Sequence, residues 1–508
     1  MSKYLATIGM EIHVELKTKS KMFCSCKNDM ELDKAPNSNI CEVCTAQPGT
    51  LPVPNGEAIK FVQLAGLAMN CTLLKDTKFD RKNYFYPDIP KGYQISQYDQ
   101  PLCQNGVLEI SNPKSRDTNN NQNQNTNIQT KKIGITRIHL EEDTGKLTHP
   151  KGASYSLVDF NRAGVPLMEL VTEPDFETGE EAREFCQKLQ QVCRYLEISD
   201  ADMEKGHMRC EANISVYLEG ADKLSGTKVE VKNINSFRFV GKAIEYEIER
   251  QIEALESGEK IVQETRGWDS IKNITFSQRV KETAADYRYF PEPDIPPMLF
   301  DDDYIENLKK ELPELPKNKL DRFIREYKIE ERDAELLISE KDLANYFEQT
   351  ISELEEKLSS GEIKSNQEKV FKLAVNYLNT EVRKHLVELQ EKIGEIKITP
   401  ENYAELIGIV ADGKINSSAA QIVLEEMYKT GGDPSQIIEE RNLSQMNDNG
   451  EMEKIVDKVL SDNQTSVEDF KNGKENAFKF LMGQVMKETG GKANPQSAME
   501  MIKDKLTK

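Results

Sequence analysis

Alternating polar side chains mark the first extended segment of the sequence. In residues 8–16, Glu11, His13 and Glu15 share one face of an expected strand, because successive side chains of a strand point to opposite sides. Apolar residues occupy the intervening positions, and residues 208–218 repeat the pattern. Alternation of this kind is typical of an antiparallel sheet that has one buried face and one polar face.

A second segment adds more groups of the same kind. In residues 134–142, the side chains of Arg137, His139 and Glu141 are in phase with one another. A sheet face that carries several carboxylates and histidines repels itself unless it binds a cation. Carboxylates that leave some coordination positions of the metal open suit Mg²⁺, because this ion keeps several water ligands and completes its coordination with phosphates of the substrate. The alternative is an ordinary solvated sheet face without a ligand.

Four of the nine cysteines lie close together, at Cys24, Cys26, Cys41 and Cys44. In a long chain that begins without a secretory signal, a local cluster of this kind indicates metal binding before it indicates disulfides. Four thiolates fill a tetrahedral Zn²⁺ site and leave no open position, so the predicted site is structural. The alternative is four reduced thiols without a metal.

The elements that must position these groups change along the chain. Residues 1–295 combine strand alternation with Gly and Pro, which predicts an α+β domain. Residues 296–400 show helical spacing and predict a helical domain, and residues 401–508 predict a small all-helical tail domain. Residues 112–130 form a polar, Asn-rich insertion between two expected strands, and a disordered hairpin loop is expected there.

Composition limits the classes of function. The chain has 508 residues with 67 Lys+Arg and 87 Asp+Glu, a formal net charge of −20. No apolar run is long enough to span a membrane and no signal peptide is recognisable, so a cytoplasmic protein is expected. Phosphate binding depends on Lys and Arg, so the acidic chain is a poor general nucleic-acid coat, and contact with a nucleic acid must be local.

Longer motifs resemble one known family along essentially the whole chain outside the Asn-rich insertion. Residues 78–101 (KFDRKNYFYPDIPKGYQISQYDQP) resemble the B subunit of aspartyl/glutamyl-tRNA amidotransferases. Further matches in the same order are GMEIHVELKTKSKMF from Gly9, ITRIHLEEDTGKLTH from Ile135, SLVDFNRAGVPLMELVTEPD from Ser156, DMEKGHMRCEANIS from Asp202, EVKNINSF from Glu230, DYRYFPEPDIPP from Asp286 and FLMGQVMKETGGKANPQ near the C-terminus. The number and order of these motifs make coincidence a poor explanation.

The resemblance implies an ATP-dependent, glutamine-hydrolysing carbon–nitrogen ligase. Members of the family phosphorylate the side-chain carboxylate of Asp-tRNA(Asn) or Glu-tRNA(Gln), and the acyl phosphate is then amidated. An amidase (A) subunit supplies the ammonia from glutamine, and a small C subunit completes a heterotrimer. The expected partners are therefore these two subunits and misacylated tRNA, with no membrane. The resemblance also implies an α+β fold with a sheet-based cradle domain, a helical domain and a small all-helical tail domain that binds tRNA. That tail has 13 Lys+Arg against 19 Asp+Glu in residues 401–508.

The resemblance also implies roles for residues that patterns alone leave open. The Mg²⁺ ligands match His13, Glu141 and Glu169, and the ATP-phosphate contacts match Lys82 and Lys91. Among these side chains Lys82 and Lys91 are expected to be catalytic. Strand parity favours Glu141 over Glu142, because Glu142 falls on the face opposite to His139.

Glu11 is in phase with His13 and is expected to be a third catalytic residue, which orients a metal-bound water. The sequence has no G-x-x-x-x-G-K-[ST] motif, so ATP is expected to bind outside a P-loop. No G-x-S-x-G elbow is present either, which agrees with an outside source of ammonia.

Two other functions compete with this interpretation. A related glutamyl-tRNA amidotransferase subunit carries an inserted synthetase-like domain, for which residues 296–400 leave no room. A non-catalytic tRNA-binding or assembly subunit would not need the Glu, His and Lys positions named above. The choice between Asp-tRNA(Asn) and Glu-tRNA(Gln), or the use of both, depends on the misacylated tRNAs that the cell makes.

Overall fold

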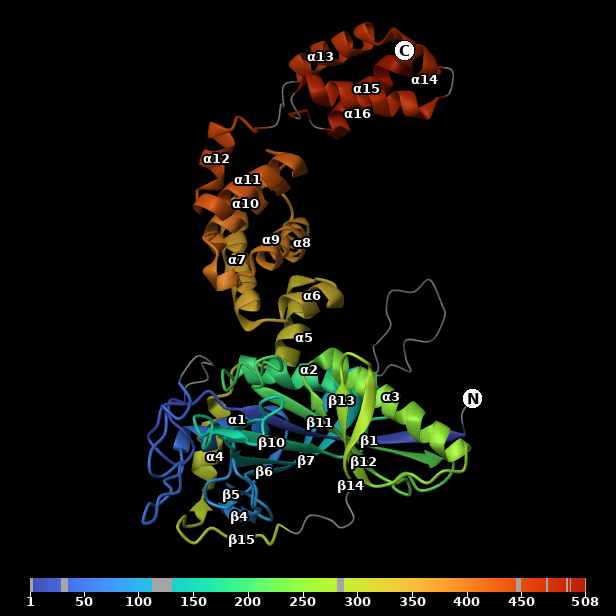
Figure 1. The fold of residues 1–508 in the computed structure, drawn as a ribbon. Coiled ribbons are helices and arrows are strands. Elements are labelled where there is room, and N and C mark those ends of the chain that lie inside the picture. The colour runs from blue at the N-terminus through green and yellow to red at the C-terminus, as the bar shows by residue number, and fades with distance from the viewer. Residues whose placement is uncertain are drawn as a thin grey trace. The chain divides into compact units, whose positions relative to one another are not determined.

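A computed structural model describes residues 3–28, 35–111, 130–280, 287–444, 449–471, 474–489, 492–493 and 495–507 (Figure 1). The chain divides into two compact units, Met1–Leu315 and Pro316–Lys508. Within the described residues, all the strands lie in the first unit, and the second unit is helical. The protein therefore has the expected α+β class, with a sheet-rich part followed by helices.

A nine-stranded sheet forms the centre of the first unit. In spatial order its strands are β14 (Ile274–Val280), β13 (Glu264–Asp269), β12 (Val229–Ile234), β11 (Met208–Leu218), β1 (Tyr4–Glu15), β10 (Pro166–Thr172), β7 (Thr130–Glu142), β6 (Cys103–Ser111) and β2 (Thr72–Leu73). All neighbours pair antiparallel except β12 and β13. Strand β1 lies near the middle of the sheet, so its residues are flanked on both sides.

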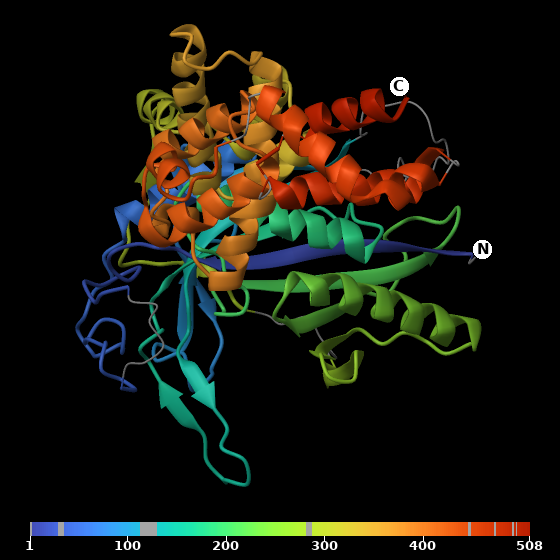
Figure 2. The ribbon, with the colours of Figure 1, turned by 90° about the horizontal axis from the view of Figure 1, so that it is seen from above.

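Three helices cover the apolar face of this sheet: α1 (Gly56–Ala68), α2 (Gly179–Tyr195) and α3 (Phe237–Glu256). Each begins at a capping side chain that accepts a backbone N–H of the first turn, namely Asn55, Thr178 and Ser236. Seen from above, α2 and α3 lie side by side over the strands (Figure 2). The apolar positions of β1, such as Met10 and Ile12, are buried in the same core.

Smaller strands lie on the opposite side of the sheet from α2 and α3 (Figure 1). Strands β4 (Asp80–Asn83), β5 (Tyr93–Ser96) and β15 (Phe290–Pro291) form one three-stranded sheet with the order β15–β4–β5. Two short pairs, β3 (Asp76–Thr77) with β16 (Met298–Leu299) and β8 (Lys146–Thr148) with β9 (Leu157–Asp159), complete the strands. The polar face of the large sheet is therefore approached by β4 and β5.

The second unit contains two buried clusters. The first is formed by α5 (Pro316–Tyr327), α6 (Glu331–Leu337), α7 (Lys341–Ser359), α8 (Gln367–Tyr377), a π-helix (Leu378–Val382), α9 (Arg383–Leu389), a 3₁₀-helix (Ile393–Glu395), α10 (Pro400–Ala411), α11 (Ser417–Thr430) and α12 (Pro434–Glu440). The second is formed by α13 (Asn449–Asp462), α14 (Gln464–Lys471), α15 (Glu475–Glu488) and α16 (Pro495–Thr507).

The structural division differs in position from the predicted boundaries near residues 295 and 400. Strand β16 and helix α4 (Asp302–Lys310) stay with the sheet, because β16 pairs with β3 and Leu308 is buried in the core of the first unit. Helices on both sides of residue 400 share one core, in which the Tyr403 hydroxyl donates to the Ala374 carbonyl at 2.8 Å. The three-domain division stays a prediction.

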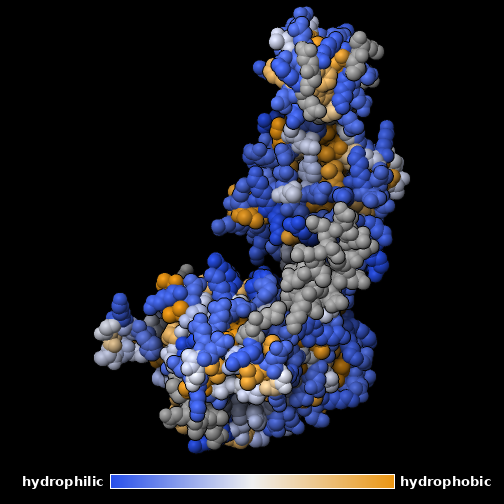
Figure 3. Space-filling model, turned by 90° about the vertical axis from the view of Figure 1, so that its right-hand side faces the viewer, coloured by the Kyte–Doolittle hydropathy of each residue, from blue (hydrophilic) through white to orange (hydrophobic). Residues whose placement is uncertain are grey.

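Other predictions concern the surface and the insertion. Residues 112–129 lie outside the described residues, and Thr130 is the first residue of β7. No helix among the described residues is long and apolar enough to cross a membrane. Figure 3 shows a mainly hydrophilic face on which hydrophobic residues form small, separate patches.

Candidate functional site

One row of polar side chains crosses four strands of the large sheet. The register pairs His13 on β1 with Arg209 on β11 and with Glu169 on β10, and it pairs Glu169 with His139 on β7. Directly paired residues of neighbouring strands present their side chains on the same face of a sheet. Strand pairing therefore assembles Arg209, His13, Glu169 and His139 from segments that are far apart in the sequence.

Short distances tie this row to Glu141, which lies two residues beyond His139 on the same face. His13 Nε2 is 3.2 Å from Glu169 Oε2 and 3.8 Å from Glu141 Oε1. His139 Nε2 is 3.3 Å from the same Glu169 oxygen and 3.8 Å from Glu141 Oε2. We call His13, His139, Glu141 and Glu169 the His/Glu cluster. The structure thus brings together His13, Glu141 and Glu169, the three residues expected to bind Mg²⁺.

Burial and charge oppose each other in the His/Glu cluster. Burial alone would lower the pKa of His13, but the hydrogen bond and charge of Glu169, with Glu141 and Glu11, raise that pKa to about 9. Burial would raise the pKa of Glu169, but His139 and His13 hold it well below its usual range. The cluster therefore keeps its carboxylates ionised by means of positive partners, and a bound cation can replace those protons.

Lys82 approaches the cluster from strand β4. Its Nζ lies 3.6 Å from Glu141 Oε2, and the hydroxyl of Ser96 on β5 donates to the same oxygen at 2.9 Å. Burial would lower the pKa of Lys82, but the charges of Glu141 and Glu169 raise it well above its usual value. A permanently charged ammonium thus sits beside the carboxylates, where it can neutralise a phosphoryl oxygen.

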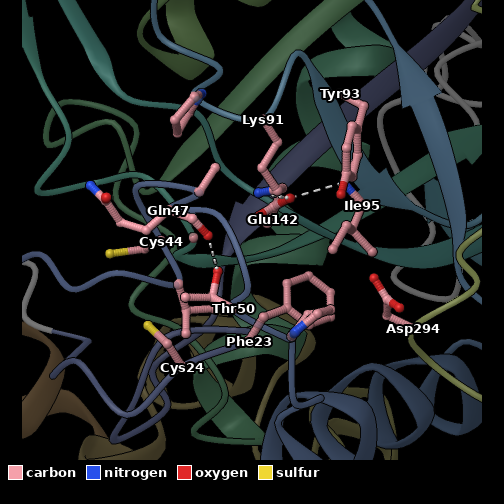
Figure 4. Close-up of a pocket in the computed structure, with 15 residues that line it drawn as sticks. Phe23, Cys24, Cys44, Gln47, Thr50, Lys91, Tyr93, Ile95, Glu142 and Asp294 are labelled. Carbon is pink, nitrogen blue, oxygen red and sulfur yellow. Dashed lines mark hydrogen bonds and ion pairs between the residues drawn. The ribbon is translucent and has the colours of Figure 1, made fainter.

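Lys91 pairs with a different carboxylate from the one that contacts Lys82. Its Nζ lies 2.7 Å from Glu142 Oε1, and that oxygen also accepts the Ile95 N–H at 2.9 Å. Glu142 and Lys91 line a cavity of about 240 Å³, which Cys24 and Cys44 also line (Figure 4). Of the two predicted phosphate contacts, only Lys82 forms an ion pair with the His/Glu cluster; Lys91 lies beside the cavity.

Glu11 lies at the other end of the polar face. It is 3.8 Å from His13 Nε2, and it can share a cation with Glu211 and Glu230. Lys232 Nζ forms an ion pair with Glu211 at 2.7 Å. Burial, followed by the charge of Glu169, raises the pKa of Glu11. Glu11 is therefore positioned between the His/Glu cluster and a second group of carboxylates.

The donor atoms fit a divalent cation. His139, Glu141 and Glu169 can each offer one ligand atom within 4.8 Å of the others, as can Glu11, His13 and Glu169. Glu169 belongs to both sets, and the Nδ1 of His139 is buried without a hydrogen-bond partner among the residues that the structure describes. Carboxylate oxygens with an imidazole and space for water suit Mg²⁺ at a phosphate-transfer site.

Sequence reasoning left His139, Glu211 and Glu230 out of the candidate ligands. The parity of β7 already placed His139 in phase with Glu141, and this was the usable signal. Glu211 and Glu230 become neighbours of Glu11 only through the pairing of β11 with β1 and β12. The alternation of side chains along one strand shows which face of the sheet a residue lies on. Only the register between strands shows which residues of the neighbouring strands lie beside it.

The four predicted zinc ligands also come together. Cys24, Cys26, Cys41 and Cys44 can each offer a sulfur within 4.8 Å of the others, and we call them the cysteine cluster. The Cys41 N–H donates to Cys44 Sγ at 3.1 Å. Hydrogen bonding from Cys24 lowers the pKa of Cys44 to about 5, and Lys21 adds to this effect. A stabilised thiolate within four convergent sulfurs fits a tetrahedral Zn²⁺ site.

Comparison with known proteins identifies the family of the chain. Residues 6–306 match the family described as the GatB/GatE catalytic domain, and residues 361–506 match the family described as the GatB domain. A protein of Thermotoga maritima, named as the B subunit of an aspartyl/glutamyl-tRNA(Asn/Gln) amidotransferase, is 48% identical over 508 residues, which cover 99% of both chains. The proteins of the same name from Thermotoga neapolitana and Caldicellulosiruptor bescii are 49% and 48% identical, over 99% and 100% of both chains. The chain is therefore a member of the aspartyl/glutamyl-tRNA(Asn/Gln) amidotransferase B-subunit family.

Proposed function

We propose that the chain transfers the terminal phosphoryl group of ATP to the side-chain carboxylate of Asp-tRNA(Asn), Glu-tRNA(Gln) or both, with release of ADP, and that ammonia then displaces phosphate from the acyl phosphate to form the amide. Membership of the amidotransferase B-subunit family supports the reaction. The observation that carries the site assignment is the His/Glu cluster with Lys82 at 3.6 Å from Glu141. Such a set of groups suits phosphoryl transfer, which depends on positioning and on compensation of charge.

The need for activation follows from elementary chemistry, because an unmodified carboxylate has no good leaving group for attack by ammonia. Lys82 would neutralise the phosphoryl group, and Lys91 would contact phosphates from the neighbouring cavity once it separates from Glu142. Glu11, which lies 3.8 Å from His13, would orient a water at the edge of the cluster. These roles account for all three residues predicted to be catalytic.

We infer that two metals belong to the functional protein. His13, Glu141 and Glu169 would hold Mg²⁺, with His139 as a further candidate ligand, and the ion would stabilise negative charge on the phosphates of ATP. The cysteine cluster would hold Zn²⁺ as a structural site, because four sulfurs leave no position for substrate. Neither proposal requires redox chemistry.

The partners follow from the chemistry of the second step. The relatives are named as one subunit of an amidotransferase, and an enzyme that makes an acyl phosphate needs a supply of ammonia. We propose an amidase (A) subunit, a small C subunit and misacylated tRNA as partners, in the cytoplasm where translation uses the product. If the isolated chain used glutamine as efficiently as free ammonia, the need for an amidase partner would be disproved.

The experiment is the substitution Glu141→Ala in the reconstituted complex. Loss of one electrostatic stabiliser should lower the rate on the order of 10²-fold or more. The tRNA-dependent hydrolysis of ATP and the amidation should fall together, because both proceed through one acyl phosphate. Glutamine hydrolysis measured without tRNA should be largely retained. Glu109→Ala, on the exposed side of β6, is the matched control on the same sheet.

A non-catalytic tRNA-binding role predicts a different result. In that case Glu141→Ala would abolish tRNA binding but leave the turnover of ATP per bound tRNA unchanged. The polar face would then be a recognition surface, and the assignment of the phosphorylation step to it would fail.

A further inference from the structure

Four tyrosines gather beside Lys82 on the polar side of the first unit. The rings of Tyr98 and Tyr289 are stacked, with centroids 4.2 Å apart and planes 9° apart. Tyr287 contacts Tyr289 at 6.0 Å and Tyr84 at 5.8 Å, both edge to face. We call Tyr84, Tyr98, Tyr287 and Tyr289 the tyrosine platform. Its members come from three separate segments of the chain.

Strand pairing explains how the platform forms. Phe290 pairs with Arg81, and the Asn83 N–H donates to the Tyr287 carbonyl at 2.8 Å, so the segment before β15 continues to run alongside β4. Arg288, which lies between Tyr287 and Tyr289 in the sequence, has φ 46°, a left-handed conformation that is uncommon for a residue with a side chain. Conformations of this kind persist where the surrounding structure holds them, often at functional sites.

The platform lies next to the proposed reaction centre. Lys82 Nζ is 5.5 Å from the centre of the Tyr287 ring, and the same ammonium is 3.6 Å from Glu141. Burial raises the pKa of Tyr289 to about 12. The positive charge of Lys82 opposes this rise, and the negative charges of Glu141 and Glu169 add to it. The phenol of Tyr289 is therefore neutral at physiological pH and can present an uncharged ring and hydroxyl to a ligand.

One side of the platform is open to solvent. Tyr98 is 57% exposed although its ring stacks on Tyr289, which leaves ring surface available for a further planar group. Phe85 and Tyr86, which directly follow Tyr84, are 90% and 57% exposed. Exposed aromatic rings beside lysines are the usual means of binding single-stranded nucleic acid, because every base offers a flat face.

We propose that the tyrosine platform binds the 3′-terminal adenosine of the aminoacyl-tRNA, with its base stacked on Tyr98. This inference rests on the proposed function. In that reaction the amino acid is esterified to the ribose of the terminal adenosine, so its base must lie within the combined length of the ribose and one aminoacyl group from the carboxylate that is phosphorylated. The platform meets this condition through Lys82, which contacts both Tyr287 and Glu141.

The adenine of ATP fits the platform less well for the same reason. The ribose and two phosphate groups separate the adenine of ATP from the reacting phosphorus, so that adenine should lie farther from the His/Glu cluster than the terminal base of the tRNA. Several exposed rings in succession also exceed what one mononucleotide uses, whereas a single-stranded tRNA end offers consecutive bases. Tyr98 is thus a positioning residue for the tRNA end.

A double-mutant cycle in the reconstituted complex tests the proposal. The dissociation constants of uncharged tRNA with and without its terminal adenosine are measured for the wild type, Tyr98→Ala and Tyr98→Phe. One stacked base corresponds to about tenfold or more in affinity, so removal of the adenosine should weaken wild-type binding by that factor. Tyr98→Ala should weaken binding of the complete tRNA equally and change binding of the shortened tRNA by less than about twofold. Tyr98→Phe keeps the ring and should behave as the wild type.

The control is Phe276→Ala on β14, an exposed aromatic at the far edge of the sheet, which should not distinguish the two tRNAs. The proposal is overturned if Tyr98→Ala and removal of the adenosine change the free energy of tRNA binding additively. It is also overturned if removal of the adenosine leaves wild-type binding unchanged, or if Tyr98→Ala raises the KM for ATP instead of weakening tRNA binding. Coupling in this cycle together with unchanged ATP turnover in Glu141→Ala would uphold the platform and reject the proposed phosphorylation site.

Discussion

The His/Glu cluster and the cysteine cluster lie in the same unit but are built in opposite ways. Three strands that are far apart in the sequence supply His13, Glu169 and His139. One short segment supplies all four sulfurs from Cys24 to Cys44. The first cluster is held by the register of a large sheet, whereas the second is held by local turns, in which the Cys41 N–H donates to Cys44.

The two clusters also differ in the positions that they leave for ligands. Four thiolates complete a tetrahedral shell, so the cysteine cluster can stabilise a fold but has no place for substrate. The His/Glu cluster mixes imidazoles, carboxylates and a nearby ammonium, and its protein ligands leave coordination positions for water and phosphate. Substitutions in the cysteine cluster should therefore change stability, and substitutions in the His/Glu cluster should change rate.

The largest effect on rate is expected for Glu169→Gln. Glu169 lies within 3.3 Å of both histidines and belongs to both possible ligand sets, so loss of its charge weakens the whole cluster. We expect kcat for tRNA-dependent ATP hydrolysis to fall on the order of 10²- to 10³-fold. Glu173→Gln, an exposed carboxylate just beyond the same strand, is the control. Equal losses in both variants would contradict a special role for the cluster.

Lys82→Ala should have the next largest effect, on the order of 10²-fold in kcat for the same reaction, because it removes the ammonium beside Glu141. Lys78→Ala is the matched control, since Lys78 comes from the same segment but pairs with Asp80 and Asp99. Parallel rate measurements on the two variants decide the question. A comparable loss in Lys78→Ala would mean that general charge, rather than position, matters.

A smaller effect is expected for Glu142→Gln. This change weakens the ion pair with Lys91 but leaves the His/Glu cluster intact. A hydrogen bond to a charged group contributes about 1.5–3 kcal/mol, and the amide of the introduced glutamine side chain retains part of this interaction with Lys91. The value of kcat should therefore change by roughly tenfold or less. The ratio of the rates of Glu142→Gln and Glu141→Gln measures which carboxylate serves the reaction. A greater loss in Glu142→Gln would reverse the assignment.

The smallest effect on rate is expected for Cys41→Ser, which separates stability from catalysis. The wild-type chain purified without chelator should carry about one zinc, as a four-cysteine site implies. The variant should lose zinc and unfold at lower denaturant concentration, with a cost of roughly 4 kcal/mol or more as is usual for loss of a metal. The rate per folded molecule should stay close to that of the wild type. Absence of zinc from the wild type would disprove the metal assignment.

Local patterns in the sequence determined much of the molecule. The parity of residues 8–16 correctly separated Met10 and Ile12, which are buried in the core, from Glu11 and His13. The spacing of the cysteines predicted their convergence, because segments this short can close on themselves without help from the rest of the fold. Strand alternation and helical spacing predicted the α+β class, which the structure confirms. The family motifs predicted the family, which the comparisons confirm.

Only the tertiary structure decided which strands are neighbours. The order β11–β1–β10–β7 pairs His13 with Glu169, and Glu169 with His139. The alternation of side chains had related His139 only to residues of its own strand, such as Glu141. Tertiary packing likewise determined that Lys91 forms an ion pair with Glu142 and that the ring of Tyr98 stacks on that of Tyr289. The physical reason is that parity depends on one strand, whereas order and register depend on how all the strands and helices bury their apolar faces together.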